Sequence, residues 1–186
     1  MNQPTSPIAQ PDAPKATASP PSVIWANNVL RSASVILDTE TTGLHGSAEI
    51  VELAIIDMAG TVLFNQRFCP LGDIDAGALA IHGLGPQELK HEPLFADYAD
   101  EIVSILVGKV CVIYNADFDV RMLKQTYAAH RLDYAWLRTV NTQCAMRIYA
   151  QSLGKNKWAK LEGGTHGALG DCIAVLELVR KMAQGG

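Results

Sequence analysis

Three short apolar runs near the start of the chain constrain its fold more than any other feature of the sequence. The first covers residues 34–37 and ends at Asp38, and the other two, 50–57 and 61–68, flank a turn at residues 57–60. Short apolar runs bounded by turn residues are typical of strands, and a tight turn joins antiparallel neighbours. The sequence therefore predicts an antiparallel meander of three strands.

The second half of the chain alternates helical periodicity with one further apolar run, 110–114, which we expect to return beside the first strand. Pro93 precedes the first helical pattern and Gly108 ends it. Helices are predicted over residues 94–107, 117–129, 142–153 and 167–183. Strands followed by alternating helices and strands are typical of an α/β layer fold with a mixed sheet.

The first 22 residues differ in composition from the rest of the chain. They carry six of the nine prolines, mixed with Ala, Ser, Thr and Gln. A segment of this kind buries too little apolar surface to offset the entropy that it would lose on ordering. We therefore expect residues 1–22 to form a disordered tail and residues 23–186 to form one domain.

Composition and charge narrow the classes of function. The net charge is −4, whereas proteins that grip long duplex DNA by its phosphates are usually basic. This counts less against an enzyme that holds one strand end, because bound dications would supply positive charge.

No apolar run approaches the ~18 residues that span a bilayer, and no secretory signal is recognisable, so we expect a soluble, cytoplasmic protein without a membrane partner. The four cysteines lack C-x-x-C spacing, which fits buried thiols in a reducing compartment.

Two carboxylates follow the first apolar run. Asp38 and Glu40 are two residues apart, so on a strand their side chains point to the same face, roughly 7 Å from each other. Two like charges at the end of an apolar strand repel each other and are costly to desolvate, and a divalent cation between them would relieve both effects. Taken alone, the pair also fits two solvated loop acids.

Two further acids begin the helix predicted over 117–129. Asp117 shares a helical face with Arg121, which indicates a solvated stripe, whereas Asp119 shares a face with Leu123 and is expected to point inward. An inward-facing Asp needs a partner, so Asp119 is a third candidate metal ligand. The alternative is a buried Asp that is bonded to the backbone.

The last helical segment carries the remaining candidates. Asp171 continues an apolar stripe that runs through Val175 and Met182, so its carboxylate is expected to face the core. The alternative is a first-turn acid that favours the helix N-terminus. His166 follows a pair of glycines and is expected at or before the first turn, from where its ring could reach a metal-bound water. A lone His is otherwise an exposed or a core residue.

Together, these residues resemble the motifs of the DEDDh (DnaQ-like) 3′→5′ exonuclease family, and the resemblance covers residues 33–183. Four stretches carry it, in the family's order: ILDTETTGL at 36–44, IHGL at 81–84, YNADFD at 114–119 and HGALGD at 166–171. The second of the acidic motifs usually opens with His, where this chain has Tyr114. Jointly the motifs are highly specific, and separate structural explanations for each acid become implausible.

The resemblance implies an RNase H-like fold, in which helices flank a mixed five-stranded sheet. It also implies two Mg²⁺ ions, with Mn²⁺ as a substitute, held by the four carboxylates Asp38, Glu40, Asp119 and Asp171. Oxygen ligands are those that such hard cations prefer. His166 would take a proton from the attacking water, so all five side chains count as catalytic. The product would be a nucleoside 5′-monophosphate.

Four residues are expected to bind the substrate. The turn after Glu40 would close on the strand end, with the backbone of Thr41 bonding the sugar and Leu44 wedging against the last base. Phe118 would stack on a base. His82 corresponds to the family's substrate-contacting His. The expected partner is the 3′ end of a nucleic acid, with single-stranded DNA in first place.

Two alternatives stay open. The first is an exoribonuclease of the RNase T type, because no residue that would meet a ribose 2′-hydroxyl can be identified and the preference for DNA rests on likeness to the proofreading epsilon subunit. The second is a catalytically silent adaptor, against which the presence of all five side chains counts. The chain ends about fifteen residues after Asp171, without the long extension by which epsilon-type subunits hold their polymerase, so a polymerase partner is unsupported.

Overall fold

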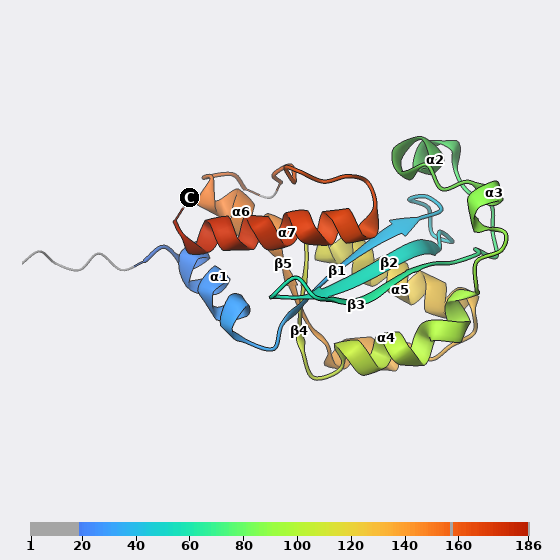
Figure 1. Cartoon of the computed structure of the whole chain (residues 1–186), viewed down its shortest axis with the longest axis horizontal. Coiled ribbons are helices and arrows are strands. Elements are labelled where there is room, and N and C mark those ends of the chain that lie inside the picture. Colours follow the sequence, from blue (N-terminus) through green and yellow to red (C-terminus); the bar gives the residue numbers. More distant parts are fainter. Residues whose placement is uncertain (1–18, 157, 186) are drawn as a thin grey trace, which may run out of the picture.

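The computed structural model describes residues 19–156 and 158–185, and a mixed five-stranded sheet of order β3-β2-β1-β4-β5 lies at its centre (Figure 1). The strands are β1 (Val35–Thr41), β2 (Ile50–Asp57), β3 (Val62–Arg67), β4 (Val110–Ile113) and β5 (Asn141–Cys144). β1, β2 and β3 form an antiparallel meander, and β4 and β5 continue the sheet parallel to β1. The predicted meander and the return of the fourth strand beside the first are confirmed.

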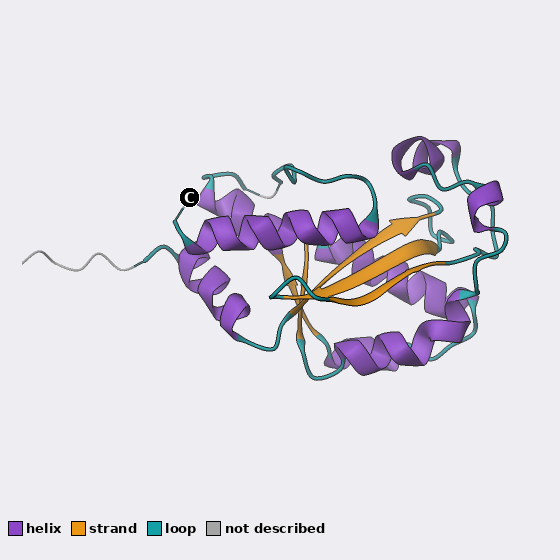
Figure 2. Cartoon of the chain, in the orientation of Figure 1, coloured by secondary structure: helices purple, strands orange, loops and turns teal. Residues whose placement is uncertain are grey.

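Helices cover both faces of the sheet (Figure 2). They are α1 (Pro21–Arg31), α2 (Ala76–His82), α3 (Pro86–Leu89), α4 (Ala99–Leu106), α5 (Ala116–Ala129), α6 (Ala145–Ser152) and α7 (Ala168–Ala183), with 3₁₀ turns η1 (Phe95–Tyr98) and η2 (Ala135–Thr139). None of the helices in the described ranges combines the length and the apolar character that crossing a bilayer requires.

Alternation along β1 divides the core into two apolar clusters. Val35 and Leu37 pack with side chains of α4 and α5 on one face, whereas Ile36 packs with side chains of α1 and α7 on the other. Successive strand residues point to opposite faces, and this alternation continues through the residues that follow Leu37. Asp38 and Glu40 therefore belong to the α7 face and Thr39 to the α5 face.

Two predicted helices differ from the structure. The segment 142–153 begins as the edge strand β5, because residues 141–144 pair in parallel with β4, and α6 starts only at Ala145. This strand is short, polar and largely exposed, so it lacks the apolar signature by which a strand is recognised. The segment 94–107 is divided into η1 and α4, because the Asp97 carboxylate accepts a bond from the Leu94 amide and tightens the first turn.

The sequence did not reveal α1. This helix begins at Pro21, with proline in its first turn, so the last residues of the segment predicted as a tail are helical, and residues 1–18 lie outside the described part. The indole of Trp25 donates to the Gln143 side chain at 2.5 Å, and Asn27 donates to the carbonyl of Ala183 at 3.2 Å. Both bonds tie α1 to β5 and to the end of α7.

Candidate active site

Three carboxylates meet at the carboxyl end of β1. Asp38 and Glu40 project from the face of β1 that α7 covers, and Asp171 comes from the first turn of α7. One carboxylate oxygen of each lies within 4.8 Å of the others. The neighbouring Cys172 thiol donates to the carbonyl of Ala54 at 3.5 Å, which holds this turn of α7 against the sheet. The acidic cluster can therefore hold a metal ion.

Asp119 approaches the cluster from the other side of β1. Its side chain is buried in the first turn of α5, and its Oδ1 accepts a hydrogen bond from the Thr39 hydroxyl at 2.8 Å. The predicted inward orientation of Asp119 is thus confirmed, although its oxygens are not among those within 4.8 Å of one another. Asp117 is exposed as expected and pairs with Arg147.

The carboxylates of the cluster and Asp119 repel one another in a poorly solvated site. Burial, with the nearby Asp119 and Asp171 carboxylates, raises the pKa of Asp38 well above its ordinary value. Burial and Asp171 raise the pKa of Glu40 to about 8, and burial raises the pKa of Asp119 to about 7. Such shifts arise when carboxylates share a poorly solvated site. A dication would restore the ionised forms, so the residues present fit a metal centre.

A fifth carboxylate, Glu52, lies beside the cluster and was not predicted from the sequence. It lies opposite Glu40 in the pairing of β1 with β2 and is buried. Its Oε2 accepts from the Ala168 amide at 2.8 Å and its Oε1 from Arg67 Nε at 2.9 Å. Glu52 therefore fixes the start of α7. The signal was a charged residue inside an apolar strand, which rarely occurs without a partner.

His166 lies two residues before α7, where it was expected. Its φ of 57° is in the left-handed region, which residues other than glycine seldom adopt. Two residues after His166, the Ala168 amide donates to Oε2 of Glu52. One residue before it, the Thr165 amide donates to Oδ1 of Asp171 at 2.7 Å. The loop is thus bonded on both sides of His166, whose side chain is exposed to water.

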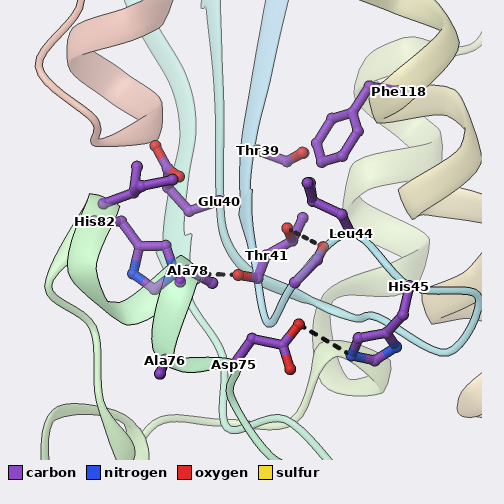
Figure 3. Close-up of a pocket in the computed structure, with 13 residues that line it drawn as sticks. Thr39, Glu40, Thr41, Leu44, His45, Asp75, Ala76, Ala78, His82 and Phe118 are labelled. Carbon is purple, nitrogen blue, oxygen red and sulfur yellow. Dashed lines mark hydrogen bonds and ion pairs between the residues drawn. The ribbon is translucent and has the colours of Figure 1, made fainter.

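A pocket of about 910 Å³ opens beside the cluster (Figure 3). All four predicted substrate-binding residues line it, together with Glu40: Thr41, Leu44, His82 and Phe118. Leu44 and Ile81 are 75% and 59% exposed, so the pocket offers large apolar side chains that the fold itself leaves uncovered. Because Glu40 belongs to both, the pocket and the acidic cluster form one continuous site.

Backbone contacts fix the walls of the pocket. His82 Nδ1 accepts from the Leu84 amide at 3.0 Å, so Nε2 carries the proton and donates to the carbonyl of Thr41 at 3.1 Å (Figure 3). Both ring nitrogens are therefore engaged, and the carbon atoms of the ring are left to face a ligand. A Cβ on Gly43 would come within 2.1 Å of the Asp75 carboxylate, which itself pairs with His45 at 3.7 Å. The close approach of Asp75 therefore leaves room only for glycine at position 43.

Comparison with known proteins decides the family. Residues 35–179 match the family model described as "Exonuclease" (RNase_T). The chain belongs to this exonuclease family. Membership of this family makes the chain an enzyme, a nuclease that hydrolyses phosphodiester bonds. The family expected from the sequence motifs is therefore confirmed.

Two curated relatives show how far the similarity reaches. The exonuclease is 34% identical over 181 residues to "Uncharacterized exonuclease CP81" of Escherichia phage 186, which covers 87% of this chain and 93% of the phage protein. It is 36% identical over 115 residues to the DNA polymerase III subunit epsilon of Rickettsia conorii, covering 58% of this chain and 50% of that protein. The chain thus matches about half the length of the epsilon subunit.

A solved structure shows the same fold. The zinc-bound complex of Escherichia coli ExoI with single-stranded DNA superimposes with a TM-score of 0.65 at 19% identity, covering 83% of this chain and 40% of that chain. At this identity the likeness concerns the fold alone. The RNase H-like architecture, with helices on both faces of a mixed five-stranded sheet, is confirmed.

Proposed function

We propose that the exonuclease removes nucleoside 5′-monophosphates one at a time from the 3′ end of single-stranded DNA. One observation carries this proposal: Glu40 lines the pocket and also belongs to the acidic cluster. A nucleotide held in the pocket would therefore present its phosphodiester to the carboxylates. The pocket volume of about 910 Å³ lies within the range of small-ligand sites, about 300–1,000 Å³.

The carboxylates would hold Mg²⁺, in two sites, with Mn²⁺ as a substitute. Asp38, Glu40 and Asp171 would bind an ion between them. Asp119 would be the fourth ligand and would approach from the α5 side. Oxygen-only donors suit these hard cations. When bound, such ions activate water and stabilise the charge that develops on the phosphate during in-line displacement.

His166 would act as the general base. A neutral imidazole can accept the proton of an attacking water, as a general base must. The loop that carries it is bonded to Asp171 through Thr165 and to Glu52 through Ala168. These two bonds fix the backbone on either side of His166, whose exposed side chain would turn toward a metal-bound water.

The terminal nucleotide would lie between apolar side chains. Leu44 and Phe118 line one part of the pocket and Ile81 another, so a base can be enclosed without sequence-specific bonds. Thr41, Asp75 and His45 also line the pocket, and their polar groups would meet the sugar. We also infer a reducing compartment such as the cytoplasm, because all four cysteines are free.

The test compares matched single-stranded DNA and RNA oligonucleotides that carry the label at either end, in Mg²⁺. For DNA, a 3′-terminal label should be released at once as a mononucleotide, whereas a 5′ label should give a ladder that shortens step by step. Chelation should stop both reactions. Asp171→Asn should be inactive, and Glu177→Gln, an exposed acid of the same helix, should keep normal activity. Release of the 5′ label first would refute the proposal.

A further inference from the structure

The pocket has no lysine or arginine to neutralise the phosphates of a longer strand. Its thirteen lining residues, all within the described part of the chain, include no Lys and no Arg. The chain as a whole carries a net charge of −4. A strand whose 3′ end enters the pocket must nevertheless place its next phosphates on the surrounding surface, where cations stabilise binding. Positively charged side chains beside the pocket would therefore determine how tightly a strand binds.

Arg121 of α5 lies at the rim of the pocket. Its guanidinium carbon is 5.4 Å from the centre of the Phe118 ring, and Nη1 donates to the carbonyl of Leu44 at 3.2 Å and to Gln125 at 3.4 Å. An arginine has five N–H donors. Within the described residues, Nε and Nη2 have no hydrogen-bond partner, so these donors face solvent on an exposed side chain.

A second hollow, of about 410 Å³, continues from Arg121 along α5. We call it the α5 hollow, and its lining residues are Ala116, Asp117, Val120, Arg121, Lys124 and Thr142. Phe118 lines the pocket and Arg121 lines the α5 hollow, so the stacked pair of side chains marks the boundary between the two.

The charge of the α5 hollow favours an anion. Asp117 is its one acidic lining residue, and Arg147 pairs with that carboxylate from α6. Neither Arg121 nor Lys124 takes part in an ion pair among the described residues, and both are exposed. Two cations are thus available next to the pocket for the phosphates of the upstream part of a strand.

We propose that the α5 hollow binds the sugar–phosphate backbone of the nucleotides immediately 5′ of the one in the pocket. This inference rests on the proposed function. Arg121 and Lys124 would each contact a phosphate. Contacts of this kind do not depend on base sequence. They would add affinity for strands over mononucleotides without taking part in the chemical step.

The experiment compares two substrates in Mg²⁺: octathymidylate, which reaches the α5 hollow, and the p-nitrophenyl ester of thymidine 5′-monophosphate, which occupies the pocket alone. Arg121→Ala and Lys124→Ala should each raise KM for the octamer about five-fold and leave kcat unchanged. Each should also reduce the slope of log(kcat/KM) against log salt by about 0.7. Both kinetic constants for the ester should stay within about two-fold of wild type.

Arg138→Ala is the matched control, because Arg138 is an exposed arginine that precedes β5 at the opposite end of the parallel strands. It should change neither KM nor the salt slope. Lys124 has no side-chain hydrogen bond or ion pair in the described structure to lose, so its variant tests the charge. Unchanged KM and slope in both α5 variants would overturn the inference. So would an equal loss with the ester and the octamer, since Arg121 would then act only by holding Leu44.

Failure of the proposed function gives a different result. In that case the wild-type protein leaves the octamer intact in Mg²⁺. Anisotropy of a fluorescent octamer in Ca²⁺, which also binds carboxylates, then tests the α5 hollow by binding alone. Weaker binding by both α5 variants but not by Arg138→Ala supports the inference, and equal binding by all four proteins overturns it.

Discussion

Thr39 donates its hydroxyl to Asp119 at 2.8 Å, across the strand from the two carboxylates that flank it in sequence. The alternation of β1 produces this arrangement, since the residue between Asp38 and Glu40 must point the other way. One strand thus presents two acids to α7 and anchors a third acid of α5. The bond also lowers the pKa of Asp119, which opposes the larger upward shift that burial causes.

Removing that hydroxyl should destabilise the protein. Thr39→Val keeps the shape of the side chain but leaves a buried carboxylate without its donor, which costs about 1–3 kcal/mol. The free energy of unfolding, measured by urea denaturation at pH 8 in chelator, should fall by this amount. Thr39→Ser should retain most of the stability because it keeps the hydroxyl. If the Val variant is as stable as wild type, the bond does not support Asp119.

Stability of the metal-free protein should decrease as pH rises. Glu40 and Asp119 have pKa values of about 8 and about 7 in the folded state, above their ordinary values near 4. Between these limits the folded protein binds more protons than the unfolded chain, so the free energy of unfolding falls with increasing pH. The stabilisation is complete below about pH 4 and is lost by about pH 8.

Melting temperatures between pH 5 and pH 9 in chelator check this prediction. Mg²⁺ should raise the melting temperature more at pH 8 than at pH 5, because it favours the ionised carboxylates. Asp119→Asn should flatten the profile, whereas Asp117→Asn, which changes an exposed acid two residues away, should leave it as in wild type. A melting temperature that rises steadily from pH 5 to pH 8 in chelator would contradict the shifts.

Glu52→Gln should slow hydrolysis without unfolding the protein. The amide can still accept from Ala168 N, but it loses the charge that pairs with Arg67. Changing a residue that orients metal ligands typically costs 10- to 100-fold in activity or metal affinity, and we expect about 10-fold for Gln and about 100-fold for Ala. Steady-state kinetics over a Mg²⁺ titration measures this. Glu92→Gln, an acid outside the site, is the control, and full activity in Glu52→Ala would rule out the positioning role.

Gly43→Ala should weaken substrate binding. The added methyl group would displace the Asp75 carboxylate, which lies where its Cβ would be, and so break the contact with His45. We expect KM for octathymidylate to rise several-fold, with a smaller effect on kcat. Gly46→Ala, in the same loop, has no atom within 4 Å of the new Cβ and should behave as wild type. Combining Gly43→Ala with Asp75→Ala should raise KM no further than Asp75→Ala alone, because the carboxylate that the methyl group displaces is then already absent, and additive effects would point to another cause.

The sequence predicts those parts of the site that depend on local periodicity. The shared face of Asp38 and Glu40 follows from the two-residue repeat of a strand, and the inward orientation of Asp119 from the helical repeat. Glu52 could not be placed in this way, because its partner amide at Ala168 is 116 residues away. Likewise, β5 is recognisable only through its pairing with β4, since its polar residues carry no strand pattern.

The bonds from Trp25 and Asn27 place α1 at the end of the sheet where β1 begins, whereas the pocket lies where β1 ends (Figure 1). The described C-terminal residues lie on the same side as α1. A surface linkage attached beside α1 or at the end of α7 would therefore lie away from the pocket. Enzyme immobilised at these positions should still act on strands supplied from solution.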